Sequence, residues 1–189
     1  MAFHSSISPA LAVLAGRRID AADSEESRFP PAAAEHVALK LLRHFRQERV
    51  KRLTCSAACG ADILALEVAE KLAIPATLVI PFTSNIFRAI SVTDRPGDWG
   101  ERFDRLVAAA RRRGDLVELG LDVNDEKAFT AANERIVQSA SISGPYRRLA
   151  FVVWEGQTRG RADATADFLS RALSRGFEKR TVLTMRRRH

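Results

Sequence analysis

The sequence has 189 residues, of which 46% are hydrophobic, and a formal net charge of +7. This length and composition are typical of one generous globular domain with a real core, and they exclude a disordered or fibrous chain. No stretch approaches the roughly 18 apolar residues of a membrane-spanning helix, and the first residues show no basic segment followed by a long apolar run. We therefore expect a cytoplasmic protein without a membrane partner.

The chain is expected to begin with a loose leader over residues 1–9, followed by a single domain over 10–189. The apolar run Ala10–Ala15 is typical of a buried strand and is broken by Gly16-Arg17-Arg18. A polar, acidic loop follows over residues 19–29. Pro30 and Pro31 then open a helix, whose apolar face comprises Ala34, Val37, Ala38, Leu41, Leu42 and Phe45.

The central stretch reads as strand, tight turn, helix and strand. A strand near Val50–Cys55 leads into the small-residue turn Ser56–Gly60, and a second strand spans Ala76–Ile80. Between them the apolar positions recur with helical period at Ala61, Leu64, Ala65, Val68, Ala69 and Leu72. This βαβ unit places backbone N–H groups at a helix N-terminus, where they can bind a phosphate or carboxylate.

The second half continues the alternation of helices and strands. Residues 82–98 show low periodicity and are expected to form a long loop that closes over the site as a lid. Further elements are expected as a helix over Trp99–Arg113, a strand over Asp115–Leu119, a helix from Asn124 or Asp125 to about Ala140, a strand over Arg148–Trp154, a helix over Asp163–Arg175 closed by Gly176, and a strand over Thr181–Met185. Inward positions on the last two helices include Ala128, Phe129, Ala132, Ile136, Ala140, Phe168, Leu169, Ala172 and Leu173.

These elements predict an α/β fold: a Rossmann-like, doubly wound, mainly parallel sheet of about six strands with helices on both faces. In such sheets ligands bind outside the carboxyl ends of the strands. Three turns gather there: residues 16–18, 56–62 and 154–165. Arginine matches phosphate well, but no turn fits the dinucleotide fingerprint or the P-loop, so ordinary NTPase chemistry is not supported.

The basic excess and the cysteines have plain interpretations. The arginine clusters 111–113 and 186–188 are interpreted mainly as solvated faces. Nucleic acid is not favoured as a partner, since few aromatic side chains accompany them.

Cys55 and Cys59 are interpreted as reduced small residues, and no histidine accompanies them at a metal-site spacing. Cys59, near a helix N-terminus, is also a candidate reactive thiol with a lowered pKa. No cofactor or metal is expected.

A family resemblance adds to this interpretation. The stretch CGADILALEVAEKLAIPATLVIPF resembles the G-A-D-x-L-A-x-E-x-A turn and helix of the SLOG superfamily, Rossmann-like proteins that include the LOG phosphoribohydrolases, DprA and the YpsA-like proteins. The strand ending at Gly16-Arg17, the Pro81-Phe82 loop and the Trp154-Glu155-Gly156 turn extend the similarity. The stretch FRAISV with Asp98-Trp99 and Arg102-Phe103 is similar to a mostly uncharacterised bacterial subgroup. The resemblance implies recognition of a nucleotide or nucleotide-derived signal, and homodimers are common in the superfamily.

One departure concerns catalysis. The LOG enzymes carry P-G-G-x-G-T-x-x-E, whose glutamate takes part in N-glycosidic bond cleavage. Aligning Thr165 with the motif threonine places Phe168 at the glutamate, and phenylalanine cannot transfer a proton. Glu67, Asp163 and Asp167 are the weak candidates for a replacement carboxylate.

Each candidate ligand contact has a structural alternative. Gly60 could instead be required by the geometry of the turn, and Asp62 could stabilise the N-terminus of its helix through the helix dipole. Thr165 and Trp154 could instead pack in the core, and Glu67 could form a surface ion pair with Lys71. The full set of candidate ligand-binding residues is Gly16, Arg17, Arg18, Ser56, Gly60, Ala61, Asp62, Arg88, Trp154, Gly156, Gly160 and Thr165.

The expected function is binding of a nucleotide or nucleotide-derived ligand at the carboxyl edge of the sheet, as a sensor or signalling domain. The first alternative is a LOG-like hydrolase or transferase acting on an N-glycosidic bond. The second is DprA-like binding of single-stranded DNA, whose affinity would fall steeply with salt.

Overall fold

Six strands form one sheet in which every neighbouring pair is parallel. The computed structural model describes residues 7–140, 144–160 and 163–185. Within them the strands are β1 (Ala10–Gly16), β2 (Val50–Cys55), β3 (Ala76–Ile80), β4 (Leu116–Glu118), β5 (Arg147–Trp154) and β6 (Glu178–Leu183). Their order across the sheet is β4-β3-β2-β1-β5-β6.

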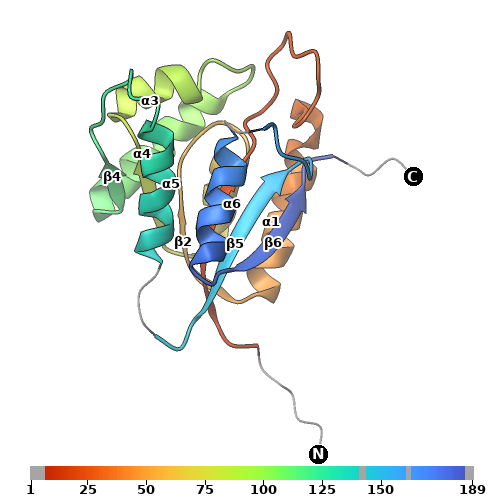
Figure 1. Ribbon diagram of the computed structural model, residues 1–189, viewed down its shortest axis with the longest axis vertical. Coiled ribbons are helices and arrows are strands. Elements are labelled where there is room, and N and C mark those ends of the chain that lie inside the picture. Colours follow the sequence, from red (N-terminus) through yellow and green to blue (C-terminus); the bar gives the residue numbers. More distant parts are fainter. Residues whose placement is uncertain (1–6, 141–143, 161–162, 186–189) are drawn as a thin grey trace, which may run out of the picture.

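Helices cover both faces of this sheet (Figure 1). They are α1 (Ala34–Gln47), which follows the short 3₁₀ helix η1 (Pro31–Ala33), and α2 (Ala61–Lys71), α3 (Ser84–Ser91), α4 (Trp99–Arg113), α5 (Ala128–Ser139) and α6 (Ala164–Ser174). The helices α1, α2 and α4 pack on one face, and α5 and α6 lie side by side on the other. The expected α/β, doubly wound fold is therefore confirmed.

The central strands explain why the sheet is buried on both sides. In β1, Ala12 and Leu14 face the core under α1, α2 and α4, whereas Val13 faces the core under α5 and α6. Near-continuous apolar sequence is what a doubly covered parallel strand requires.

The topology creates a crevice at one edge of the sheet. The chain runs outward from β1 through β2, β3 and β4, then returns to place β5 on the other side of β1. The connections that follow β1 and β5 therefore leave in opposite directions, and ligands bind at such switch points in open α/β sheets.

Several sequence expectations need correction. The expected loop over residues 82–98 contains the helix α3, whose amphipathic pattern is short and buries only Phe87 and Ser91. The α5 helix begins at Ala128, because Asp122 and Asp125 form turns before it. The last strand runs from Glu178 to Leu183, three residues earlier at its start than expected.

Two side chains expected to face inward do not. Phe129 is 43% exposed and Leu173 is 47% exposed. The buried stripe of each helix is therefore narrower than its apolar stripe: α5 buries Ala128, Ala132, Asn133, Ile136 and Val137, and α6 buries Thr165, Phe168, Leu169 and Ala172.

Parts of the expectations lie outside the described residues, namely most of the leader (1–6) and the arginine cluster 186–188. The other arginine cluster, 111–113, ends α4, where basic side chains complement the helix dipole. Among the described residues no helix is long and apolar enough to cross a bilayer.

Candidate functional site

A cavity of about 580 Å³ lies at the carboxyl ends of β1 and β2. The turn after β1, the turn before α2, the helices α3 and α5, and the start of α6 enclose it. This is the crevice that the sheet topology creates, and its volume is within the range of small-molecule sites.

One part of the cavity wall is apolar. Phe87 and Ile90 come from α3, and Phe129 and Ile136 come from α5. The ring of Phe129 meets that of Phe82 edge to face, with centroids 5.6 Å apart. Because Phe129 is partly exposed, this wall offers an aromatic surface to a flat ligand group.

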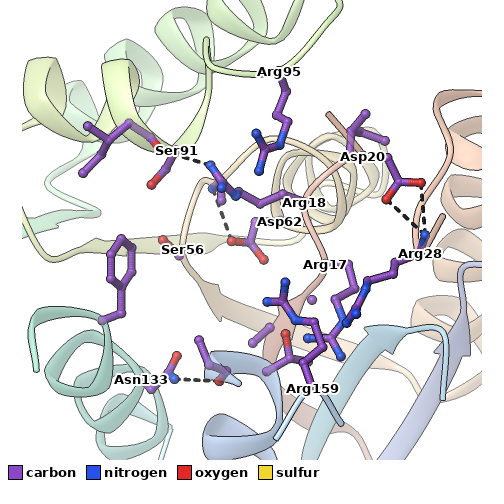
Figure 2. Close-up of a pocket in the computed structure, with 18 of the residues that line it drawn as sticks. Arg17, Arg18, Asp20, Arg28, Ser56, Asp62, Ser91, Arg95, Asn133 and Arg159 are labelled. Carbon is purple, nitrogen blue, oxygen red and sulfur yellow. Dashed lines mark hydrogen bonds between the residues drawn. The ribbon is translucent and has the colours of Figure 1, made fainter. Parts of the chain in front are cut away.

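Arginines dominate the charged part of the wall. The five that line the cavity are Arg17, Arg18, Arg28, Arg95 and Arg159. Figure 2 shows Arg18 and Arg95 on one side of Asp62, with Arg17 and Arg159 on the other.

Most of these guanidinium groups are already paired. Arg18 contacts Asp94 at 2.8 Å, and Arg95 contacts the same carboxylate at 3.2 Å. The guanidinium of Arg159 has no hydrogen-bond or ion-pair partner among the described residues, and the Nε of Arg95 is buried without one. These two groups are donors that an anion in the cavity could use.

Arg17 is a structural residue at the back of the site. It is 3% exposed and donates to Asp163 at 2.6 and 2.8 Å, to Glu155 at 2.7 and 3.1 Å, and to the Gln157 carbonyl oxygen. Its guanidinium also lies 5.8 Å from the Trp154 ring centroid. Arg17 therefore ties the end of β1 to the β5–α6 connection.

Asp163 completes this arrangement as the N-cap of α6. Its Oδ1 accepts from the backbone N–H groups of Thr165 and Ala166, and its Oδ2 accepts from that of Arg159. Burial raises the pKa of Asp163, but hydrogen bonds from Arg17 and the backbone outweigh it and bring the pKa to about 2. Asp163 is therefore a fixed carboxylate.

Asp62 lines the same cavity from the first turn of α2 and has no such partners. It is 6% exposed; its Oδ2 accepts from the Ala58 N–H at 3.2 Å, and its Oδ1 is buried with no hydrogen-bond partner among the described residues. Burial raises the pKa of Asp62 to about 7, although the Ala58 N–H lowers it. This is the one acidic group of the lining that lacks a full set of partners.

The other two acidic groups of the lining are engaged. Asp20 accepts from the backbone N–H groups of Arg28 and Phe29 and from the Ser27 hydroxyl, while Glu26 pairs with Arg28. They stabilise the loop that follows β1.

Gly60 and Gly16 allow this loop to approach α2. A Cβ at Gly60, which has φ of 97°, would lie 2.8 Å from the Ile19 nitrogen and 2.9 Å from the Arg17 carbonyl oxygen. A Cβ at Gly16 would collide with Ala61. Both glycines therefore serve close packing within the chain.

The turn before α2 differs from the expected anion cradle. The N–H of Ala61 donates to the Arg17 carbonyl oxygen at 3.1 Å, and the N–H of Cys59 donates to the Ser91 carbonyl oxygen at 3.0 Å. These groups satisfy chain oxygens, so fewer donors face the cavity than the sequence predicts.

The structure brings together half of the predicted ligand-binding residues. Those that line the cavity are Gly16, Arg17, Arg18, Ser56, Asp62 and Thr165. Those outside its lining are Gly60, Ala61, Arg88, Trp154, Gly156 and Gly160. Arg88 instead contacts Asp104 at 2.8 Å, between α3 and α4.

The candidate catalytic carboxylates lie outside the cavity lining. Glu67 pairs with Arg102 and Arg105 of α4. Asp167 pairs with Arg171 and accepts from the Asn133 amide, and Asp163 holds Arg17. Phe168 is fully buried in the core.

Sequence reasoning missed several lining residues, chiefly Phe87, Arg95, Phe129, Asn133 and Arg159. Arg159 follows β5 within a turn already singled out, so its position was a usable signal. Phe87 and Phe129 carry no local signal, because helix packing alone decides which aromatic side chain faces a crevice.

The expected lowered pKa of Cys59 is wrong. Burial raises the pKa of the Cys59 thiol to about 11, and Arg18 offsets this only in part. The pKa of Cys55 is also raised by burial. Both cysteines are free and buried, as small core residues.

The fold and cavity define the class of protein: a doubly wound α/β domain with an arginine-lined crevice at its switch point. No family model matches the chain, and no curated protein matches it either. Among the described residues no group of three or more His, Cys, Asp or Glu side chains is placed to hold a metal ion.

Proposed function

We propose that the cavity binds a nucleotide or nucleotide-derived ligand and that the domain acts as a sensor or signalling module. The observation that carries the proposal is one cavity, at the switch point, that combines an aromatic wall with guanidinium donors that lack partners. An aromatic wall suits a base, and the unpaired guanidinium of Arg159 suits a phosphate. The volume of about 580 Å³ is sufficient for a mononucleotide.

Arg159 is the residue best suited to test the phosphate contact. It is exposed, and its guanidinium has no partner among the described residues, so removing the side chain leaves no unpaired carboxylate behind. Charge-assisted hydrogen bonds contribute about 1.5 to 3 kcal/mol, so we expect Arg159→Ala to weaken phosphate binding tenfold or more. Arg46→Ala, at an exposed arginine of α1 outside the lining, is the matched control.

The experiment is a thermal-shift panel of mono-, di- and cyclic nucleotides, nucleosides and short single strands at two salt concentrations. A ligand at a hundred times its Kd adds about 2.7 kcal/mol, which is roughly 5 to 10 °C for a domain of this size. A shift that Arg159→Ala reduces to about half or less and that Arg46→Ala retains supports the proposal. The absence of any shift with nucleotides contradicts it.

The two alternatives give different outcomes in the same panel. Single-stranded DNA binding would show affinity that falls steeply with salt. A hydrolase or transferase would release a free base from a bound nucleotide, which chromatography detects. The structure offers no specific support for the hydrolase alternative, because the three proposed carboxylates are engaged outside the cavity lining.

A further inference from the structure

Asp62 is a residue of the cavity lining whose carboxyl group has an incomplete set of hydrogen bonds. Its carboxyl group lies between the two sets of arginines in Figure 2. One oxygen accepts from the Ala58 N–H, and the other is buried without a partner among the described residues. A buried polar atom without a partner costs free energy, so its retention at a cavity points to a contact that a ligand completes.

The ion pairs of the surrounding arginines indicate whether Asp62 is ionised or protonated in the cavity. Two arginines of the lining are committed to other carboxylates: Arg17 to Asp163 and Glu155, and Arg18 to Asp94. No ion pair reaches Asp62 among the described residues. A carboxylate placed here would also repel an anionic nucleotide in the same cavity.

The neutral acid satisfies both constraints. Its carbonyl oxygen accepts from the Ala58 N–H, and its hydroxyl is a hydrogen-bond donor for a partner in the cavity. We propose that protonated Asp62 donates a hydrogen bond to an acceptor oxygen or ring nitrogen of an anionic nucleotide bound in this cavity. This inference rests on the proposed function and adds the feature of the ligand that the site selects.

Protonation of Asp62 then controls affinity near neutral pH. The titratable and charged groups around it are Cys55 and Cys59 from β2 and its turn, Arg17 and Arg18 after β1, Asp94 and Arg95 after α3, and Arg159 after β5. The thiols stay protonated because their pKa values are raised, and Asp94 is held in ion pairs. Asp62, with a pKa of about 7, is the group of this set that changes charge between pH 6 and 8.

Asp62→Asn is the decisive variant because it makes the donor permanent. The asparagine oxygen can accept from the Ala58 N–H, and its NH₂ group then occupies the place of the unpartnered oxygen. The probes are AMP and GMP, and their dissociation constants are measured by calorimetry at pH 6 and pH 8. If only the protonated form binds, the wild-type affinity falls about tenfold over this interval.

We expect Asp62→Asn to match the wild-type affinity for AMP or GMP at pH 6 and to bind about tenfold more tightly than the wild type at pH 8. The phosphate of the probes titrates near pH 6, but it does so equally for both proteins and cancels in their ratio. Glu70→Gln, which removes an exposed carboxylate of α2 paired with Arg105, is expected to keep the wild-type pH dependence.

Two results would overturn this inference alone: loss of binding by Asp62→Asn at pH 6, or a wild-type to variant affinity ratio that does not change with pH. The first would show that the site needs a carboxylate. No binding of either probe or of any other panel nucleotide, by either protein at pH 6, would overturn the proposed function and this inference with it. The two failures are therefore distinguishable.

Discussion

Two aspartates at one cavity show how environment decides the chemistry of a carboxyl group. Asp163 and Asp62 each lie at the start of a helix, α6 and α2, and both are buried, with 2% and 6% exposure. The pKa of Asp163 is about 2, whereas that of Asp62 is about 7. A helix N-terminus is common to both, so the helix dipole does not explain the difference.

The hydrogen-bond and ion-pair partners of the two aspartates explain the difference between their pKa values. Asp163 receives a guanidinium and three backbone N–H groups, which compensate the charge that burial penalises. Asp62 receives one backbone N–H at 3.2 Å. The first group is suited to hold the framework of the site, and the second is suited to respond to what enters it.

The largest effect is expected from Arg17→Met, which would leave the buried Asp163 without its cation, whereas the partly buried Glu155 would keep Arg28. Breaking a buried ion pair from one side costs about 3 to 5 kcal/mol. Urea unfolding at pH 7 measures this loss. Arg105→Met, at an exposed arginine that pairs with Glu70, should cost about 1 kcal/mol or less. Equal losses in the two variants would contradict the assigned structural role of Arg17.

A smaller effect is expected from Asp62→Asn, which should raise the free energy of unfolding at and above pH 7, whereas Arg17→Met lowers it. The folded pKa of Asp62 is raised, so the folded state favours its proton, and ionisation lowers the free energy of unfolding as pH rises from about 4 to 7. One pKa unit corresponds to about 1.4 kcal/mol, so the wild type should lose up to about 4 kcal/mol relative to the variant.

Unfolding of both proteins at pH 4, 6 and 8 measures this difference, and the series is extended to pH 2 for Asp163→Asn. Asp163→Asn provides the contrasting profile, because the folded pKa of Asp163 is lowered. Its contribution is present above about pH 4 and is lost as the pH falls towards 2. Parallel wild-type and Asp62→Asn profiles between pH 4 and 8 would show that Asp62 titrates normally.

The sequence predicted the fold well, because periodicity and turn residues act locally. The run over Ala10–Ala15 and the stretch from Val50 to Ile80 have the strands and the helix where the pattern placed them. The helix α3 escaped because two buried side chains over eight residues give too weak a pattern. Phe129 was placed inward from its apolar spacing, whereas in the structure it meets Phe82 and lines the cavity.

The candidate site was less predictable, because its chemistry depends on contacts between distant residues. Arg17 was expected to bind an anion because its guanidinium matches phosphate. In the structure its donors are occupied by Asp163 and Glu155, which lie more than 130 positions away in the sequence. Asp62 was selected from its motif, yet its missing partner is a property of the folded environment. No local pattern distinguishes a paired carboxylate from an unpaired one.

The smallest effect is expected from Glu67→Gln, which tests the same contrast within a single helix. Glu67 follows Asp62 by five residues of α2, and at about 100° per residue the two side chains point some 140° apart. Glu67 therefore faces α4, where Arg102 donates to it at 2.9 Å, while Asp62 faces the cavity. Partly exposed pairs of this kind contribute about 1 kcal/mol or less to stability.

We expect Glu67→Gln to unfold at nearly the wild-type urea concentration and to bind AMP and GMP with the wild-type pH dependence. A loss of nucleotide binding or turnover in this variant, with stability retained, would place a functional carboxylate on the α4 side of α2. That result would favour the hydrolase alternative and would move the site away from the cavity. The comparison with Asp62→Asn on the same helix thus decides which face of α2 carries the function.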